Sequence, residues 1–222
     1  MMNIEVLVES LGTTSHHTLQ GIRAKLCASG GESVVALAQA LRHRNHDIAV
    51  QAAVVLGLLP QEDAVLANPA LIELAGSRQV ELRRACISTL GRICQLPEET
   101  LPRLALALAD DDVIVRRYAA AAIGMFYHAA ITVADNLIIA LSDNDNTVRY
   151  FALSSLEDIN PLPVSVLARL HRIQRHSELS TKLGIRRIIQ KIEIEAVKNR
   201  KIDKGTQNQQ KTNRRKKQTV NF

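Results

Sequence analysis

Four segments that align without gaps recur in the middle of the chain, and they constrain the fold more than any other feature. They are residues 48–57, 82–91, 115–124 and 148–157, whose last residues lie 34, 33 and 33 positions apart. Each segment begins with an aliphatic residue, has Ala or Cys four places later, and has Leu or Ile at its ninth place. This spacing forms one apolar stripe on a helix, and its small central residue lets a neighbouring helix approach closely. The pattern predicts a series of helices that pack against one another.

A shorter apolar segment precedes each of these helices, and a polar turn joins the two. The shorter segments are residues 34–41, 71–75, 101–108 and 131–141. Two of the turns share the pattern L-x-D-x-D-x-x-V-R, at residues 108–116 and 141–149. Asp112 and Asp145 in these turns are predicted to cap the free N–H groups of the second helix. A helical hairpin of this kind cannot bury both of its faces alone, so neighbouring hairpins must stack.

The unit L-x-D-x-D-x-x-V-R, followed by small residues and a closing L/I-G, resembles the HEAT repeat. It is most similar to the short HEAT-like repeats of the phycobilisome lyase type. The resemblance implies an all-α, right-handed α-solenoid of about five to six helical hairpins. The sequence departs from the pattern at Ala49, where the Arg is missing, and at Glu157, which replaces the closing Gly. We expect capping helices in residues 1–30, repeats in 31–159, further capping helices in 160–200 and a disordered basic tail in 201–222.

Three arginines occupy the same place in successive repeats: Arg83, Arg116 and Arg149. The resemblance to HEAT repeats implies that this Arg pairs with the Asp of the preceding turn, and Asp112 and Asp145 are in position for it. We interpret the set as a structural ladder, because partly buried charges need partners. A row that binds anions is the alternative.

The next position along carries Arg84, Arg117 and Tyr150, and one turn later come Ser88 and Ser154. In a HEAT-like stack this part of the second helix faces the concave surface. Exposed Arg and Tyr are common anchors at protein interfaces. We therefore predict that these five residues contact a protein partner, with an ordinary solvated surface as the alternative.

Charge divides the chain into an acidic body and a basic end. Residues 1–159 hold 12 Lys and Arg against 18 Asp and Glu, whereas residues 160–222 hold 16 against 4. A basic helix followed by a basic arm can hold phosphate backbones without reading their sequence. The candidate contacts for nucleic acid or an acidic partner are Arg186, Arg187, Lys191, Lys198, Arg200, Lys201, Arg214, Arg215, Lys216 and Lys217.

Several kinds of site are missing from the sequence. It has no G-x-x-x-x-G-K-[ST], G-x-G-x-x-G, G-x-S-x-G, C-x-x-C or H-E-x-x-H pattern, so we expect no cofactor, no metal and no enzyme activity. No apolar stretch approaches the roughly 20 residues of a membrane span. The three cysteines do not form a disulfide scaffold, and the N-terminus does not look like a secretory signal, so we expect a cytoplasmic protein.

These features favour a non-enzymatic scaffold or adaptor that binds a protein on its concave helix surface. A protein that associates with nucleic acid through its basic C-terminal end is the alternative. An accessory subunit of the lyase type is a weaker possibility, because its resemblance lies in generic repeat residues and transfers no catalytic residue. A base-excising glycosylase is disfavoured by the lack of Trp and the scarcity of other aromatic residues.

Overall fold

The fold is taken from a computed structural model that describes residues 3–12, 15–159 and 161–219, with side chains described as far as Arg200. The chain divides into two compact units, residues 1–160 and residues 161–222. Within the described residues all regular secondary structure is helical, as the repeat pattern predicts. Each unit is described by itself.

The first unit is a series of helical hairpins. The shorter first helices are α1 (Ile4–Glu9), α3 (Val34–Ala40), α6 (Asn68–Leu74), α8 (Pro97–Ala107) and α10 (Ala134–Ala140), and the second helices are α2 (His16–Ala28), α4 (His46–Leu56), α7 (Val80–Ile93), α9 (Val113–Gly124) and α11 (Asn146–Asp158). Short helical turns lead into several first helices, namely η2 (Gly30–Ser33), α5 (Gln61–Ala64), η3 (Val65–Ala67) and η4 (Tyr127–Val133), while η1 (Ser10–Gly12) follows α1.

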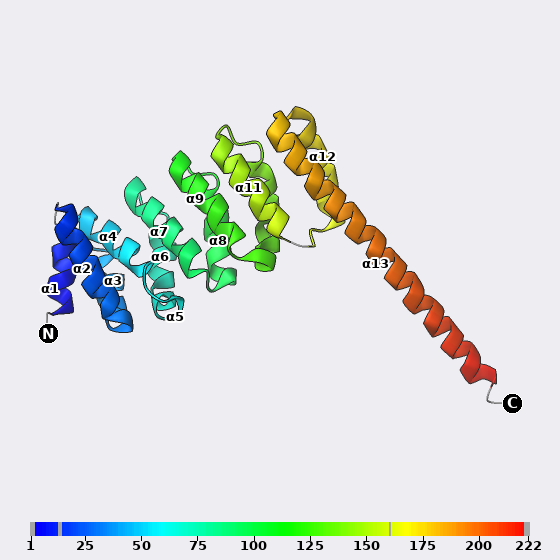
Figure 1. The fold of residues 1–222 in the computed structure, drawn as a ribbon, viewed down its shortest axis with the longest axis horizontal. Helices are drawn as coiled ribbons and strands as arrows, with labels where there is room; N and C mark the ends of the chain where they lie inside the picture. The colour runs from blue at the N-terminus through cyan, green and yellow to red at the C-terminus, as the bar shows by residue number, and fades with distance from the viewer. Residues whose placement is uncertain (1–2, 13–14, 160, 220–222) are drawn as a thin grey trace. The chain divides into compact units, whose positions relative to one another are not determined.

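The hairpins stack in sequence order, so that the second helices form one layer and the first helices another (Figure 1). In the second-helix layer α4 packs on α7, α7 on α9, and α9 on α11. Each of these helices also packs on the first helix of its own hairpin, as α8 does on α9 and α10 on α11. The central expectation of the sequence, that each hairpin covers the apolar flank of the next, is confirmed.

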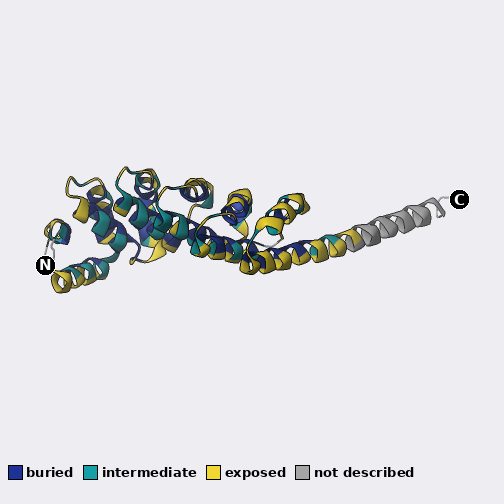
Figure 2. Cartoon of the chain, turned by 90° about the horizontal axis from the view of Figure 1, so that it is seen from above, coloured by how far each residue is buried: buried dark blue, intermediate teal, exposed yellow. Residues whose placement is uncertain are grey.

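The core of this unit consists of the repeated aliphatic and small positions. The central small residues Ala52, Cys86, Ala119 and Ala152 are fully buried, and the ninth-place residues Leu56, Leu90, Ile123 and Leu156 are at most 1% exposed. Figure 2 shows these buried segments on the inward sides of the helices, with exposed residues on the outward sides and in the turns. Since aliphatic burial contributes about 25 cal/mol per Å², this interior supplies the main stabilisation of the stack.

The closing glycines mark the points of closest helix approach. A Cβ atom added at Gly91 would lie 2.5 Å from Ala122 Cβ and 3.0 Å from Ala122 Cα in the next hairpin. At Gly57 the nearest atom would be Thr89 Oγ1 at 3.0 Å. Glycine is therefore required most strictly at Gly91, where the facing atom belongs to the backbone.

The second unit is a hairpin of α12 (Leu167–His176) and the long α13 (Leu179–Thr219), preceded by the turn η5 (Val164–Val166). Its buried residues include Leu170 of α12 and Ile185, Ile188 and Ile192 of α13. The backbone of α13 is helical to Thr219, and the expected disordered tail of residues 201–222 stays a prediction. Lys, Arg and Gln have high helix propensity, and this stretch contains no Pro.

Candidate partner-binding surface

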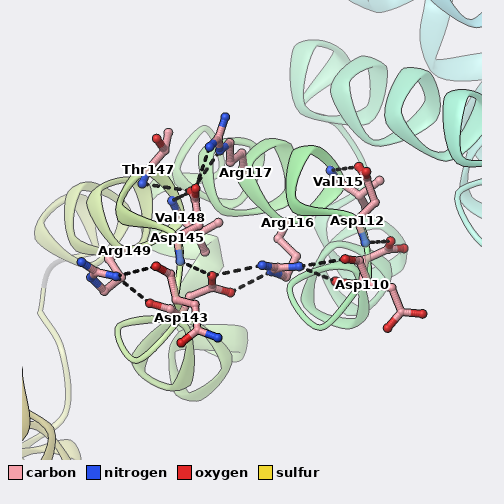
Figure 3. Close-up of polar contacts among 12 residues, drawn as sticks. Asp110, Asp112, Val115, Arg116, Arg117, Asp143, Asp145, Thr147, Val148 and Arg149 are labelled. Carbon is pink, nitrogen blue, oxygen red and sulfur yellow. Dashed lines mark hydrogen bonds and ion pairs between the residues drawn. The ribbon is translucent and has the colours of Figure 1, made fainter.

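Two arginines of the second-helix layer link successive hairpins through ion pairs. Arg83 of α7 donates from Nε and Nη2 to the carboxylate of Asp110, at 2.8 Å each. Arg116 of α9 repeats this contact with Asp143, at 2.8 and 3.2 Å. All four side chains are less than a fifth exposed. We call these two pairs the inner ladder, and Figure 3 shows the pair of Arg116 with Asp143.

The inner-ladder arginines also hold the turn that precedes their own helix. Arg83 Nη1 donates to the Ser77 carbonyl at 3.0 Å, and Arg116 Nη1 donates to the Asp110 carbonyl at 2.9 Å. Arg149, which is buried, makes the same contact with the Asp143 carbonyl at 2.8 Å. Each arginine therefore fixes its own turn, and the first two also fix the turn of the next hairpin.

A second pair of arginines forms an outer ladder one residue further along each helix. Arg84 binds Asp112 through two hydrogen bonds of 2.9 and 2.6 Å, and Arg117 binds Asp145 with the same two distances. These arginines keep about a third of their side chains exposed. The outer ladder thus lies at the surface of the second-helix layer, beside the inner ladder.

The predicted ladder exists, but its partners were wrongly assigned. Asp112 and Asp145 bind Arg84 and Arg117, whereas Arg83 and Arg116 bind Asp110 and Asp143. The expected partner was the Asp of the preceding turn, but each arginine extends across the stack to a carboxylate in the turn of the next hairpin and reaches only backbone carbonyls in its own turn. One residue turns the side chain by about 100°, so adjacent arginines reach different carboxylates of that next turn. Arg84 and Arg117 were predicted to contact a partner only, and they are also structural ion-pair residues.

The carboxylates of the outer ladder cap the helices as predicted. Asp112 accepts a hydrogen bond from Val115 N at 3.0 Å, and Asp145 accepts from Thr147 N and Val148 N at 3.0 and 2.9 Å. The hydrogen bonds from Arg84 and Arg117, joined by these backbone N–H groups, hold the pKa values of Asp112 and Asp145 far below the ordinary value of an aspartate. Both carboxylates are therefore ionised at neutral pH.

The remaining predicted contact residues are accessible but lie on different helices. Tyr150 and Ser154 of α11 are exposed, and the Tyr150 ring lies 5.5 Å from the Phe151 ring in an edge-on arrangement. Ser88 of α7 is half-buried, and it shares a surface groove with Arg84. The structure thus joins Arg84 with Ser88, while Tyr150 and Ser154 form a separate part of the layer.

The groove runs over α7, between α4 and α9, and has a volume of about 380 Å³; we call it the α7 groove. Its apolar walls come from Val50 and Val54 of α4, from Leu58 in the turn after α4, and from Ile114 and Tyr118 of α9. Its base comes from α7, through Glu81, Arg84, Ala85, Ser88, Thr89 and Arg92. The volume lies in the usual range of ligand-binding clefts, which are about 300–1,000 Å³.

Sequence reasoning missed the residues that make this groove apolar. Tyr118, at 43% exposed, and Leu58, at 48%, are large apolar side chains left uncovered on the second-helix layer. The signal for Tyr118 was present, because it follows Arg117 directly and adds an aromatic residue to the same predicted surface. The apolar wall residues that come from α4 could not be predicted from the sequence in this way, because their place in the groove depends on where two hairpins meet.

The predicted basic surface of the second unit is exposed as far as its side chains are described. Arg186, Arg187, Lys191, Lys198 and Arg200 are all exposed on α13, and Lys198 Nζ pairs with Glu195 at 2.7 Å. The side chains of Lys201, Arg214, Arg215, Lys216 and Lys217 lie outside the described residues. Their role in binding nucleic acid or an acidic protein stays a prediction.

Neither a metal-binding cluster nor a membrane-spanning helix is present in the residues that the structure describes. Among them, no three His, Cys, Asp or Glu side chains gather in a way that could hold a metal ion. Within the same part of the chain, no helix has the length and apolar character needed to cross a membrane.

The repeat geometry agrees with the comparison to protein families, in which residues 34–122 match the model of HEAT repeats. This segment consists of HEAT repeats. No curated protein matches the sequence. An α-solenoid of HEAT or armadillo type is also the fold of the solved structures that are similar to this chain.

Three of these structures illustrate the similarity. An engineered protein has a TM-score of 0.62 at 20% identity and covers 87% of this chain and 97% of its own. A designed armadillo repeat protein in complex with the peptide (KR)4 has a TM-score of 0.61 at 16% identity, with 86% and 100% covered. The CpcE–CpcF complex of phycocyanin lyase from Nostoc sp. PCC7120 has a TM-score of 0.50 at 22% identity, with 69% and 96% covered. These similarities establish the fold that the HEAT-repeat chain shares with them.

Proposed function

We propose that this HEAT-repeat protein is a non-enzymatic scaffold that binds a protein partner on its second-helix layer. The observation that carries the proposal is the α7 groove, whose apolar walls come from two helices fixed to α7 by stacking. A regular stack presents such a surface with little conformational entropy to lose on binding. The solved structures of similar fold include one bound to a peptide and one that is a complex of two proteins, which supports the same use of the fold here.

The two ladders support this role because they fix the positions of neighbouring second helices relative to one another. Four Arg–Asp pairs join α7, α9 and the turns that follow them, and each pair is bidentate. Bidentate Arg–carboxylate contacts add geometric specificity to their energy. The proposal therefore assigns the ladders to structure and the exposed residues Tyr118, Tyr150 and Ser154 to contact.

The test is affinity capture from the native cell with two variants, one altered on the second-helix layer and one on the first-helix layer. Tyr118→Glu places a charge on the second-helix layer, and Leu106→Glu places one on α8, where Leu106 is 68% exposed. Because both side chains are exposed, neither variant should unfold the protein. We expect Tyr118→Glu to lose the captured partner and Leu106→Glu to keep it. Equal recovery by both variants would place the partner elsewhere.

Binding of nucleic acid at the second unit is a second candidate function, favoured by the exposed basic residues of α13. Contacts with phosphates release counterions, so affinity should fall steeply as salt rises. The test compares the full chain with a form that lacks residues 198–222, using a mixed-sequence duplex and a single strand as probes. Among the residues of α13 whose side chains are described, which end at Arg200, the last buried one is Ile192, so this deletion leaves the described hairpin core in place. Equal binding and an equal salt slope for both forms would exclude a role for the deleted segment.

The proposal includes a cytoplasmic location and no catalytic activity. The three cysteines, Cys27, Cys86 and Cys94, are free thiols, which suits a reducing compartment. Assays of bilin transfer and of base excision would test the absence of activity directly, since these are the reactions of lyase-type and glycosylase-type proteins with similar repeats.

A further inference from the structure

We propose that the α7 groove receives an amphipathic helix of the partner, which lies antiparallel to α7 with an acidic first turn at Arg92 and a basic last turn at Glu81. This inference rests on the proposed function and specifies the chemistry of the partner. It is argued from the arrangement of apolar and charged residues around the groove.

The groove follows one face of α7 for three helical turns. Glu81, Ala85, Ser88 and Arg92 are spaced by four, three and four residues, so they lie on the same side of the helix. From Glu81 to Arg92 the axis advances roughly 16 Å, at about 1.5 Å per residue. A partner helix of about three turns therefore matches the length of the groove.

The cross-section of the groove suits a helix with one apolar face. Between its two charged ends the base carries the small residues Ala85, Ser88 and Thr89 beside the ion-paired Arg84, whereas the walls carry Leu58 and Tyr118. A low base between two apolar walls accepts a row of aliphatic side chains at positions i, i+3 or i+4, and i+7 of a docked helix. The outward face of such a helix would stay in water.

Charge fixes the direction of the occupant. Glu81 lies at the N-terminal end of α7 and Arg92 in its last turn, both are exposed, and in the described part of the chain neither forms an ion pair. Arg92 is held in place by a hydrogen bond from Nε to the Gly57 carbonyl at 2.7 Å. Arg84, the other charged residue of the base, is already neutralised by Asp112. Two opposite charges about three turns apart thus remain available to a ligand.

An antiparallel helix satisfies both charges at once. Its first turn would lie at Arg92 and its last turn at Glu81. Helices favour acidic residues in the first turn and basic residues in the last, because these complement the helix dipole. A parallel helix would need the reverse, with a base in its first turn and an acid in its last, which opposes its own dipole.

The experiment uses a displayed library of peptides about 14 residues long, each with three aliphatic positions on one helical face. Half of the library carries an acid in the first turn and a base in the last, and half carries the reverse order. A second library of the same composition contains central prolines, so that its members bind only as extended chains. Binders are selected on the full-length protein, on Tyr118→Glu and on the charge-swapped variant Glu81→Lys/Arg92→Glu.

We expect the acid-first helical peptides to be enriched on the wild-type protein, with an affinity about fivefold above that of the reverse order, since two exposed ion pairs distinguish them. This preference should shrink or reverse on the charge-swapped variant and all binding should be lost on Tyr118→Glu. Circular dichroism should show that the swapped variant folds, because both side chains are exposed.

Three results would overturn the inference, and they separate it from the proposed function. Binders that depend on Tyr118 but show no order of charge would remove the antiparallel helix and leave the scaffold in place. Enrichment of the proline-containing peptides would replace the helix by an extended segment. Binders that are indifferent to Tyr118→Glu, or no binders at all, would count against both the groove and the second-helix layer as the contact surface.

Discussion

In the described residues no Arg–Asp pair joins α4 to α7, whereas the junctions from α7 to α9 and from α9 to α11 are each crossed by two Arg–Asp ion pairs. We call the α4–α7 contact the neutral junction, although an exposed Arg42–Glu73 pair joins the turn before α4 to α6 in the other layer. At the neutral junction Ala49 and Val50 stand where Arg83 and Arg84 stand in the next repeat. Its polar contacts are uncharged at one end or both: Gln79 Nε2 lies 2.9 Å from His46 Nε2, Thr89 Oγ1 donates to the Ala53 carbonyl at 2.7 Å, and Arg92 donates to the Gly57 carbonyl. The same helical packing is thus achieved with and without the ladders.

This difference shows what the ladders add to a stack that aliphatic packing already holds. Val50 is too short to reach the turn of the next hairpin, so it leaves its surface uncovered and becomes a wall of the α7 groove. Where Arg84 and Arg117 are present, they extend across the junction to Asp112 and Asp145. Ion pairs reinforce the two charged junctions, whereas the neutral junction leaves an apolar surface exposed.

The largest expected effect tests whether packing differs between the junctions. Gly91→Val should destabilise the protein by about 3 kcal/mol, because its side chain would collide with the backbone of Ala122. Gly57→Val should cost only about 1 kcal/mol, since the facing Thr89 and Arg92 side chains can move. Urea unfolding followed by circular dichroism measures both. Equal losses would show that the two junctions are packed with the same tolerance.

A smaller effect tests how much the Arg–Asp ion pairs contribute to stability. Asp145→Ala should cost about 2 kcal/mol, because it removes a helix cap and leaves Arg117 without its partner. Asn45→Ala, at the corresponding cap of α4, should cost about 1 kcal/mol, since Asn45 accepts only from Asp47 N and pairs with no arginine. Urea midpoints of the two variants provide the comparison. If Asn45→Ala cost as much as Asp145→Ala, the ion pair would contribute nothing beyond the cap.

The smallest effect concerns pH. The pKa values of Asp112 and Asp145 are lower in the folded chain than the roughly 3.9 of an unfolded one, so their stabilisation is complete above pH 4 to 5. It is lost as the pH falls further, through the folded values. Asp112→Asn/Asp145→Asn should therefore be less stable than the wild type at pH 7 by about 1 kcal/mol, a modest amount because the paired arginines are a third exposed.

The difference in stability between the two proteins should shrink progressively as the pH falls from about 4 to 2, because the unfolded chain takes up protons first and the advantage of the charged carboxylates declines. Thermal unfolding at a series of pH values would show this convergence. A difference that stays constant down to pH 2 would assign the effect of the substitutions to packing, and not to the charged ladder.

Much of the fold could be predicted because it depends on local spacing. The period of about 33 residues placed the four second helices, and the buried residues Ala52, Cys86, Ala119 and Ala152 follow from the place of the small residue in that period. The caps at Asp112 and Asp145 were equally accessible, since a cap is made within a few residues of chain. Composition did not fix where α13 ends, because a polar, basic segment is compatible with both helix and disorder.

The candidate site was predicted only in part. Arg84 and Ser88 do line the α7 groove, while Val54, Leu58, Ile114 and Tyr118 were missed because they come from helices that precede and follow α7 in other hairpins. The expected pairing of Arg116 and Arg149 with Asp112 and Asp145 of the preceding turn failed for a related reason, since Arg116 binds Asp143 of the next hairpin and Arg149 donates to the Asp143 carbonyl. Spacing places Arg83 and Arg84 at the same junction, but the rotation between them decides which carboxylate each one reaches.

The sequence by itself determined the repeating hairpin, its buried stripe and its capped turns, because these depend on helical periodicity and on hydrogen bonds between near neighbours. Only the tertiary structure decided which Arg joins which Asp and where the second-helix layer stays open. Those outcomes depend on the register between hairpins some 33 residues apart, which is set by the packing of all the buried side chains at once.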